Sequence, residues 1–184
     1  MSLPHLLLGM LDVPATGYDL KRTFDRTLRH FWAAELSQIY PTLQRLERQK
    51  LVRSKRAPSA RGPARRLYRR TGAGRRHLLA WLREPPQIGD QRQAWLGQLC
   101  FMAETGGTKR AAAFLIELRH HFTTRVAAYD DIERVWFREA PGFPDDLSLD
   151  DLHAHFTLRA GIARANAAIA WCDECLARLH RRRA

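Results

Sequence analysis

Residues 36–52 read LSQIYPTLQRLERQKLV, and this stretch decides the fold. Its apolar residues recur every three or four positions, which predicts a helix that begins near Leu36, with Ser37 or Gln38 as its N-terminal cap. Pro41 then lies in the first two turns, where a missing N–H does least harm.

The face of this helix opposite the apolar residues is polar. It carries hydroxyl, amide and guanidinium side chains, the types that contact base edges and phosphates in DNA. An ordinary solvated helix face has a similar composition, so the face alone leaves both interpretations open. Under the DNA interpretation, we expect base readout by Ser37, Gln38, Thr42, Gln44 and Arg45.

A basic hairpin follows the helix. Residues 51–53 begin an extended stretch and residues 67–69 form its return, and the segment 57–64 between them contains Pro58, Gly62 and Pro63, which favour a loop. A ribbon of this charge repels itself unless a polyanion lies against it, so we expect phosphate contact along both strands. Its eight cations are Arg53, Lys55, Arg56, Arg61, Arg65, Arg66, Arg69 and Arg70. Arg61, at the predicted tip, is the candidate for a minor groove.

Helices are expected on both sides of this core. Apolar spacing predicts helices over residues 3–11, 18–30 and 72–84, the last one capped by Thr71 and returning Leu78, Leu79 and Leu82 to the core. The order of three helices, a hairpin and a fourth helix is that of a winged helix-turn-helix. We expect further contacts with the DNA backbone from Lys21, Arg22 and Arg48.

The charge of the chain is unevenly distributed. The net charge is +12, and residues 1–83 hold 18 Lys and Arg against 5 Asp and Glu, whereas residues 84–184 hold 13 against 14. A general preference for arginine would have loaded both halves equally. The asymmetry therefore predicts a polyanion partner for the first half and a different role for the second.

The sequence offers no sign of export or membrane insertion. The apolar stretch at residues 3–8 follows no basic region, and no run approaches the ~20 apolar residues of a membrane span. Three cysteines are an odd number and argue against a disulfide framework. We expect a cytoplasmic protein, located at the nucleoid, with no membrane partner.

Three motifs in the first half resemble the PadR family of transcriptional regulators. Residues 39–52 resemble the family's YPxLxxLExxGLV pattern, residues 17–20 (GYDL) resemble its GYEL, and residues 68–74 match its YxxTxxG. The resemblance implies a DNA-binding winged-helix domain. One departure is Lys50, where the family usually has glycine. Either the helix ends in a left-handed turn at a cost of about 1 kcal/mol, or the chain leaves it differently.

The second half is predicted to be helical throughout. Pro85, Pro86 and Gly89 indicate a boundary, so we expect a winged-helix domain over residues 1–84 and a helical domain over 85–184. Long helices are expected over 108–139 and from a cap at Ser148 onward. The last helix carries a heptad seam: Leu158, Ile162, Ala165, Ile169, Cys172, Leu176 and Leu179.

This seam predicts a dimer. Helices so long and apolar cannot bury all their apolar surface within one small chain, so we expect them to meet a second copy about a two-fold axis. The segment also resembles, by length and helix pattern, the C-terminal domain of longer PadR-type regulators, which implies dimerisation and an effector site. The expected fold class is thus mostly α, a winged helix-turn-helix with a two-stranded wing plus a coiled-coil-like helical domain.

No residue constellation predicts catalysis, a cofactor or a metal. Cys172 and Cys175 fall on a helix, where we interpret them as packing residues, and His153 and His155, two residues apart, point away from each other. No phosphate-binding or nucleophile motif occurs, so we expect no enzyme. Trp95, just past the boundary, is the candidate contact for a small aromatic or apolar effector, although plain packing also explains it.

These observations predict a homodimeric transcriptional regulator, a ligand-responsive repressor acting on a two-fold operator in double-stranded DNA. The alternative is a winged-helix adaptor whose basic face docks an acidic protein. Salt dependence separates the two, because phosphate contacts release counterions and DNA binding falls steeply with salt.

Overall fold

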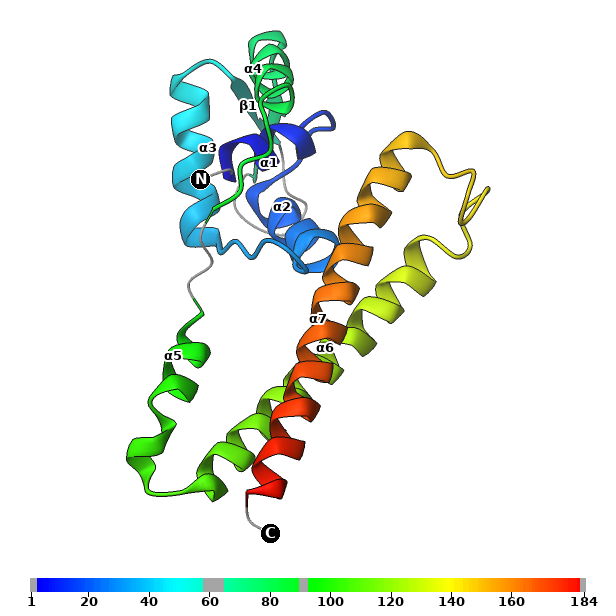
Figure 1. The fold of residues 1–184 in the computed structure, drawn as a ribbon. Helices are drawn as coiled ribbons and strands as arrows, with labels where there is room; N and C mark the ends of the chain where they lie inside the picture. Colours follow the sequence, from blue (N-terminus) through cyan, green and yellow to red (C-terminus); the bar gives the residue numbers. More distant parts are fainter. Residues whose placement is uncertain (1–2, 58–64, 90–92, 183–184) are drawn as a thin grey trace. The chain divides into compact units, whose positions relative to one another are not determined.

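The computed structural model describes residues 3–57, 65–89 and 93–182. The chain divides into two compact units, residues 1–88 and 89–184, and each is described by itself. The predicted fold class is confirmed: both units are mainly helical, and the described residues form one two-stranded antiparallel sheet (Figure 1).

Four helices surround the core of the first unit: α1 (Leu3–Met10), α2 (Gly17–Thr23), α3 (Leu36–Arg48) and α4 (Gly72–Leu82). A π-helical turn, Phe24–Leu28, extends α2, which the sequence did not predict. The fully or almost fully buried apolar residues are Leu7, Leu8, Leu11, Leu20, Phe24, Ala34, Ile39, Leu43, Leu46, Val52, Tyr68 and Leu78. Leu82, assigned to this core by its spacing, is instead 60% exposed, because α4 ends there.

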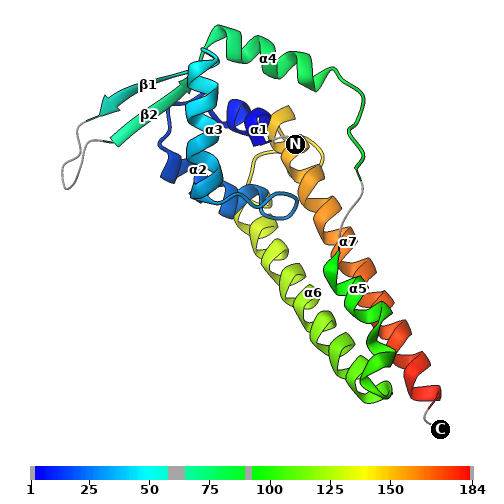
Figure 2. The ribbon, with the colours of Figure 1, turned by 90° about the vertical axis from the view of Figure 1, so that its left-hand side faces the viewer.

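The wing is the two-stranded hairpin that the sequence predicted. Strand β1 (Val52–Ala57) pairs antiparallel with β2 (Arg65–Arg70), in a register that sets Val52 opposite Arg70. The two strands extend away from the helices of this unit (Figure 2). The chain between α1 and α2 adds an unpredicted bridge, because the backbone of Ala15 exchanges hydrogen bonds of 3.0 and 2.9 Å with Tyr68.

Helix α3 ends in a left-handed turn at Lys50, whose φ is 58°. The Leu51 N–H donates to the Leu46 carbonyl (2.9 Å), and the Lys50 N–H donates to the Glu47 carbonyl (2.9 Å). This pair of bonds is the Schellman motif, which usually has glycine in the left-handed position. The sequence left open whether α3 ends in a left-handed turn at Lys50 or in another way. The chain adopts the left-handed turn, which is strained for a residue with a Cβ.

We expect Lys50→Gly to stabilise the first unit by about 1 kcal/mol, because glycine adopts a positive φ without the Cβ penalty. Thermal unfolding followed by circular dichroism should show a higher Tm. Lys50→Ala keeps a Cβ and serves as the control, with little change expected. A Tm for the glycine variant equal to that of the alanine variant would contradict the strain argument.

The second unit is built on a pair of long antiparallel helices. Helix α5 (Ala94–Cys100) and a 3₁₀ turn (Met102–Thr105) lead into α6 (Thr108–Trp136), and α7 (Leu149–Arg181) returns along it. The Ser148 hydroxyl accepts from the Asp151 N–H, so the predicted cap is confirmed. No helix among residues 3–57, 65–89 and 93–182 is long and apolar enough to cross a membrane.

The heptad seam of α7 packs within its own chain. Leu158, Ile162 and Ala165 form a buried cluster with Tyr129 of α6, and Cys172 is fully buried. Ile169, Leu176 and Leu179 are partly buried. The expectation that these seven residues make the dimer contact is therefore wrong for the four buried ones, because they are already covered within their own chain.

Candidate nucleic-acid interface

Helix α3 presents a polar face to solvent. Ser37, Gln38, Gln44 and Arg45 are all exposed, as the prediction of a DNA-reading face requires. Thr42 corrects that prediction: it is 8% exposed, and its hydroxyl donates to the Gln38 carbonyl at 2.7 Å. It lies beside the buried residues of the same helix, and we remove it from the candidate readout set.

The start of α3 also differs from expectation. The N-terminal cap is Glu35, not Ser37 or Gln38. The side-chain oxygen of Gln38 accepts a hydrogen bond from the Glu35 N–H at 3.1 Å, which satisfies one of the donors that a helix leaves open at its start. Gln38 therefore has a structural role in addition to any contact with a base.

One face of the wing is strongly cationic. Because side chains alternate along a strand, Arg53 and Lys55 of β1 share a face with Arg65 and Arg69 of β2, and all four are exposed. Arg53 lies directly opposite Arg69 in the register. Like charges in such a pair repel, and a phosphate between them would relieve the repulsion. Arg22, Arg48 and Arg56 are also exposed.

Three of the cations predicted to contact phosphates have partners within the chain. Lys21 lies 2.6 Å from Asp25 and 3.4 Å from Glu35, and the hydrogen bond to Asp25 raises the pKa of the Lys21 ammonium group. The Arg70 guanidinium donates to the Leu8 carbonyl at 3.2 Å. These contacts tie Lys21 to the π-helical turn and to the start of α3, and Arg70 to α1.

Arg66 is the third of these cations. Its partner, Glu47, was not predicted from the sequence to have a role. Arg66 pairs with Glu47 of α3 at 3.3 Å. Glu47 is the sole acid between residues 36 and 71, where eleven Lys and Arg occur, and this isolation was the available signal. The predicted minor-groove residue, Arg61, lies outside the described residues.

In the second unit, the predicted effector contact Trp95 packs against aromatic side chains of both long helices. Its ring centroid lies 6.0 Å from that of Phe122 on α6 and 5.7 Å from that of Trp171 on α7. This arrangement fits the packing interpretation that the sequence left open. The same rings also form an aromatic surface on which a flat ligand could stack.

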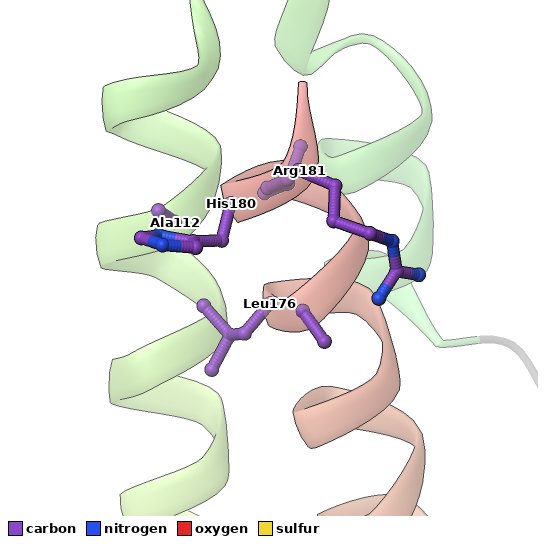
Figure 3. Close-up of a pocket in the computed structure, with 6 residues that line it drawn as sticks. Ala112, Leu176, His180 and Arg181 are labelled. Atoms are coloured by element: carbon purple, nitrogen blue, oxygen red, sulfur yellow. The ribbon is translucent and has the colours of Figure 1, made fainter. Parts of the chain in front are cut away.

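An open hollow of about 490 Å³ lies where α6 begins and α7 ends. Figure 3 shows the His180 ring turned toward Ala112 of α6, while Arg181 points away from it. The hollow is lined by Ala112, Leu176, Ala177, Leu179, His180 and Arg181. Apolar seam residues near the end of α7 are therefore only partly covered within the chain.

The cysteines show no sign of a reactive or metal-binding pair. Cys172 is buried, and burial raises the pKa of its thiol, while Cys175 is half-buried with its thiol pKa also raised by burial. Within the parts of the chain that the structure describes, no three His, Cys, Asp or Glu side chains are grouped to hold a metal ion.

Two family models match consecutive parts of the chain. The transcriptional regulator PadR-like family matches residues 7–80, and the family described as virulence activator alpha C-term matches residues 91–180. A probable transcriptional regulator of Mycobacterium tuberculosis is 30% identical, with 100% of both chains covered. The negative transcriptional regulator PadR of Bacillus subtilis is 24% identical over 95% of this chain and 96% of that protein.

Solved structures show the same fold along almost the whole chain. Bacillus subtilis PadR in complex with operator DNA has a TM-score of 0.80 at 19% identity, covering 97% of this chain and 99% of that one. The same protein with p-coumaric acid has a TM-score of 0.75 at 20% identity, covering 97% and 95%. The Vibrio cholerae virulence activator AphA has a TM-score of 0.74 at 29% identity, covering 98% and 99%. The winged-helix unit, the long-helix pair and these similarities together place the chain in the PadR-like family of transcriptional regulators.

Proposed function

We propose that the protein is a sequence-specific DNA-binding repressor that acts as a homodimer on a two-fold operator and releases DNA when it binds a small aromatic or apolar effector. The observation that carries this proposal is the exposed cationic face of the wing, with Arg53 opposite Arg69, in the same unit as the exposed polar face of α3. A helix for the major groove and a ribbon for the backbone beside it are the two parts of a winged-helix reader.

Exposed apolar side chains in the second unit support the dimer. Several large ones are 44–72% exposed, and a second copy would cover them. They are Leu96, Phe101, Ile116, Val135, Trp136, Leu149 and Phe156. In a dimer on a two-fold operator, the two copies of α3 would lie about one DNA turn apart, ~34 Å. Light scattering should therefore give twice the mass of the 21.2 kDa chain.

The effector and the direction of regulation rest on the relatives. The Bacillus subtilis protein is named a negative regulator and was crystallised with p-coumaric acid, which supports repression and an aromatic effector. The candidate contact for such an effector is Trp95, which lies beside the rings of Phe122 and Trp171. The Vibrio cholerae protein is named an activator. A reporter gene behind the chain's own operator, with and without the protein, decides the direction.

The test of the DNA-reading assignment compares two substitutions. Arg53→Ala should weaken binding to a selected duplex and to a random duplex alike, and reduce the slope of log K against log salt by about 1, because it removes a phosphate contact. Gln44→Ala should reduce affinity for the selected duplex about tenfold and leave the random duplex unchanged, because it removes a base contact.

Mobility-shift titrations at two salt concentrations measure both effects. Equal losses on both duplexes for Gln44→Ala would refute its role in base readout. Binding that barely responds to salt would instead favour the adaptor alternative, in which the basic face docks an acidic protein.

A further inference from the structure

The isolated carboxylate of Glu47 joins the two elements that the proposed function places on DNA. The Ser54 hydroxyl on β1 donates to Glu47 Oε1 at 2.6 Å, and the Arg66 Nε on β2 donates to the Ser54 oxygen at 2.7 Å. Arg66 Nη2 lies 3.3 Å from Glu47 Oε2, which closes the set. We call these three residues the wing relay.

The wing relay begins level with the buried base of the hairpin, because Ser54 lies opposite Tyr68, and it reaches farther out along the strands through Arg66. Val52 and Tyr68 are buried in the core and fix the start of the wing. Arg66 comes two residues before Tyr68, toward the far end of the strands, and its guanidinium carbon lies 5.9 Å from the Tyr68 ring centroid. The Glu47 side chain is only 27% exposed and that of Arg66 is 54% exposed, so the charge pair is partly shielded from water.

The charge of Glu47 works against DNA binding as such. It is the one acid among eleven cations between residues 36 and 71, and a carboxylate near phosphates repels them. Simple electrostatics therefore predicts tighter binding when Glu47 is removed. A positioning role predicts the opposite for a specific duplex, because α3 and the wing reach their contacts together only when the angle between them is fixed.

We infer that Glu47 is a positioning residue for DNA reading: through Ser54 and Arg66 it holds the wing at a fixed angle to α3. This inference rests on the proposed function. It also assigns Arg66 a task inside the protein in place of the phosphate contact expected from the sequence.

The first experiment measures the sign of the effect. The wild-type protein first enriches a 30-bp duplex from a random library. The wild type and the Glu47→Ala variant are then each titrated against this duplex and against a scrambled duplex, both fluorescently labelled. We expect Glu47→Ala to weaken binding to the enriched duplex about tenfold and to leave binding to the scrambled duplex unchanged or slightly tighter. Unchanged or tighter binding of the enriched duplex would overturn the inference.

A double-mutant cycle then tests the route through Arg66. If the three residues act as one unit, the variant Arg66→Ala should lose about as much affinity for the enriched duplex as Glu47→Ala does. The double variant Glu47→Ala/Arg66→Ala should lose no more than either, because each substitution breaks the same set of contacts. Additive losses would instead mean that Arg66 contacts phosphates independently. Glu47→Gln keeps an acceptor for the Ser54 hydroxyl and should recover part of the specific affinity, a rescue that a change in net charge alone would not produce.

Glu84→Ala is the matched control, because it removes an exposed carboxylate of the same unit that lies outside the relay. It should bind both duplexes as the wild type does. Thermal unfolding of every variant identifies a loss due to misfolding, and in that case Glu47→Gln and Ser54→Ala carry the test. Failure of the wild type to enrich or bind any duplex would refute the proposed function, and the inference with it. Wild-type binding with an unaffected Glu47→Ala variant would refute the inference alone.

Discussion

Gly74→Ala is expected to destabilise the winged-helix unit by about 3 kcal/mol, which for a domain of this size lowers its Tm by more than about 10 °C. A Cβ at position 74 would lie 2.1 Å from the carbonyl oxygen of Leu51 and 3.1 Å from a methyl group of Leu8. The first neighbour is backbone and cannot rotate away. Helix α4 would have to move off the end of α3 to accept the methyl group.

That movement would break the contacts that hold the start of α4. The Leu51 carbonyl accepts from the Thr71 N–H at 2.9 Å. The Thr71 hydroxyl lies 2.8 Å from the Lys50 carbonyl oxygen and 3.1 Å from that of Leu51, and it caps α4 by accepting from the Gly74 N–H at 3.1 Å. Displacing α4 would therefore cost the cap, worth about 1 kcal/mol, and loosen the packing of Leu78 on the core.

Gly72→Ala provides the control in the same helix. Its Cβ would meet only an Arg76 nitrogen at 3.8 Å, an ordinary contact, and alanine favours a helix more than glycine does. We expect no loss of stability or a gain of up to ~1 kcal/mol. Urea and thermal unfolding of the two variants measure the contrast, and equal stability of Gly74→Ala and Gly72→Ala would contradict the close-approach argument.

The elements of this fold could be predicted because short stretches of sequence specify them. Apolar spacing indicated α3, and the hydroxyl caps at Thr71 and Ser148 begin the helices they were expected to begin. The motif around Gly74 supported the family resemblance, but it gave no reason for a glycine. The reason is the Leu51 carbonyl, which approaches through the tertiary fold.

Side-chain partners could not be predicted because they are distant in the sequence. Glu47 is 19 residues from Arg66, and the Leu8 carbonyl is 62 residues from Arg70. A count of cations therefore predicted a DNA-binding surface without revealing that these two arginines have partners in their own chain. Thr42 shows a related limit, since a residue at the edge of an apolar stripe is assigned to either face equally well.

The heptad pattern of α7 is compatible with a partner helix from the same chain or from a second chain. A seam of residues spaced by four and three predicts that another helix packs along it, but it does not say which chain supplies that helix. The structure places α6 there, against Leu158 and Ile162. Leu158 and Ile162 are therefore already buried within the chain and leave no surface for a second copy.

The second large effect is expected at a buried carboxylate between the long helices. Glu133 on α6 is 8% exposed, and its Oε1 lies 2.9 Å from Nε2 of His155 on α7. Arg138 and Arg159 approach the same carboxylate at 3.3 and 3.4 Å. Phe137 stacks obliquely on the His155 ring, with centroids 5.0 Å apart, and helps to exclude water.

Glu133→Ala should destabilise the second unit by about 3 kcal/mol, because it leaves buried His155 without its hydrogen-bond partner. Glu133→Gln keeps an acceptor and should cost less. Asp131→Ala is the control. It removes a salt bridge to Arg134 in which the Asp131 side chain is 70% exposed, so it should change the free energy of unfolding by less than ~0.5 kcal/mol. Urea unfolding at one fixed protein concentration compares the three variants, and equal costs for Glu133→Ala and Asp131→Ala would contradict the argument.

The pH dependence of the stability difference between the wild type and Glu133→Gln gives an independent check. Burial alone would raise the pKa of Glu133, but the hydrogen bonds from His155 and Arg138, with the charge of Arg159, hold the pKa below its ordinary value of 4.5. A group with a lowered pKa in the folded state stabilises the fold fully above its unfolded pKa, and loses that contribution as the pH falls through the lowered value. The stability gap between the wild type and Glu133→Gln should therefore shrink as the pH falls below about 4.5. A gap that widens over that acidic range would mean that the carboxylate is not held in its charged form by these partners.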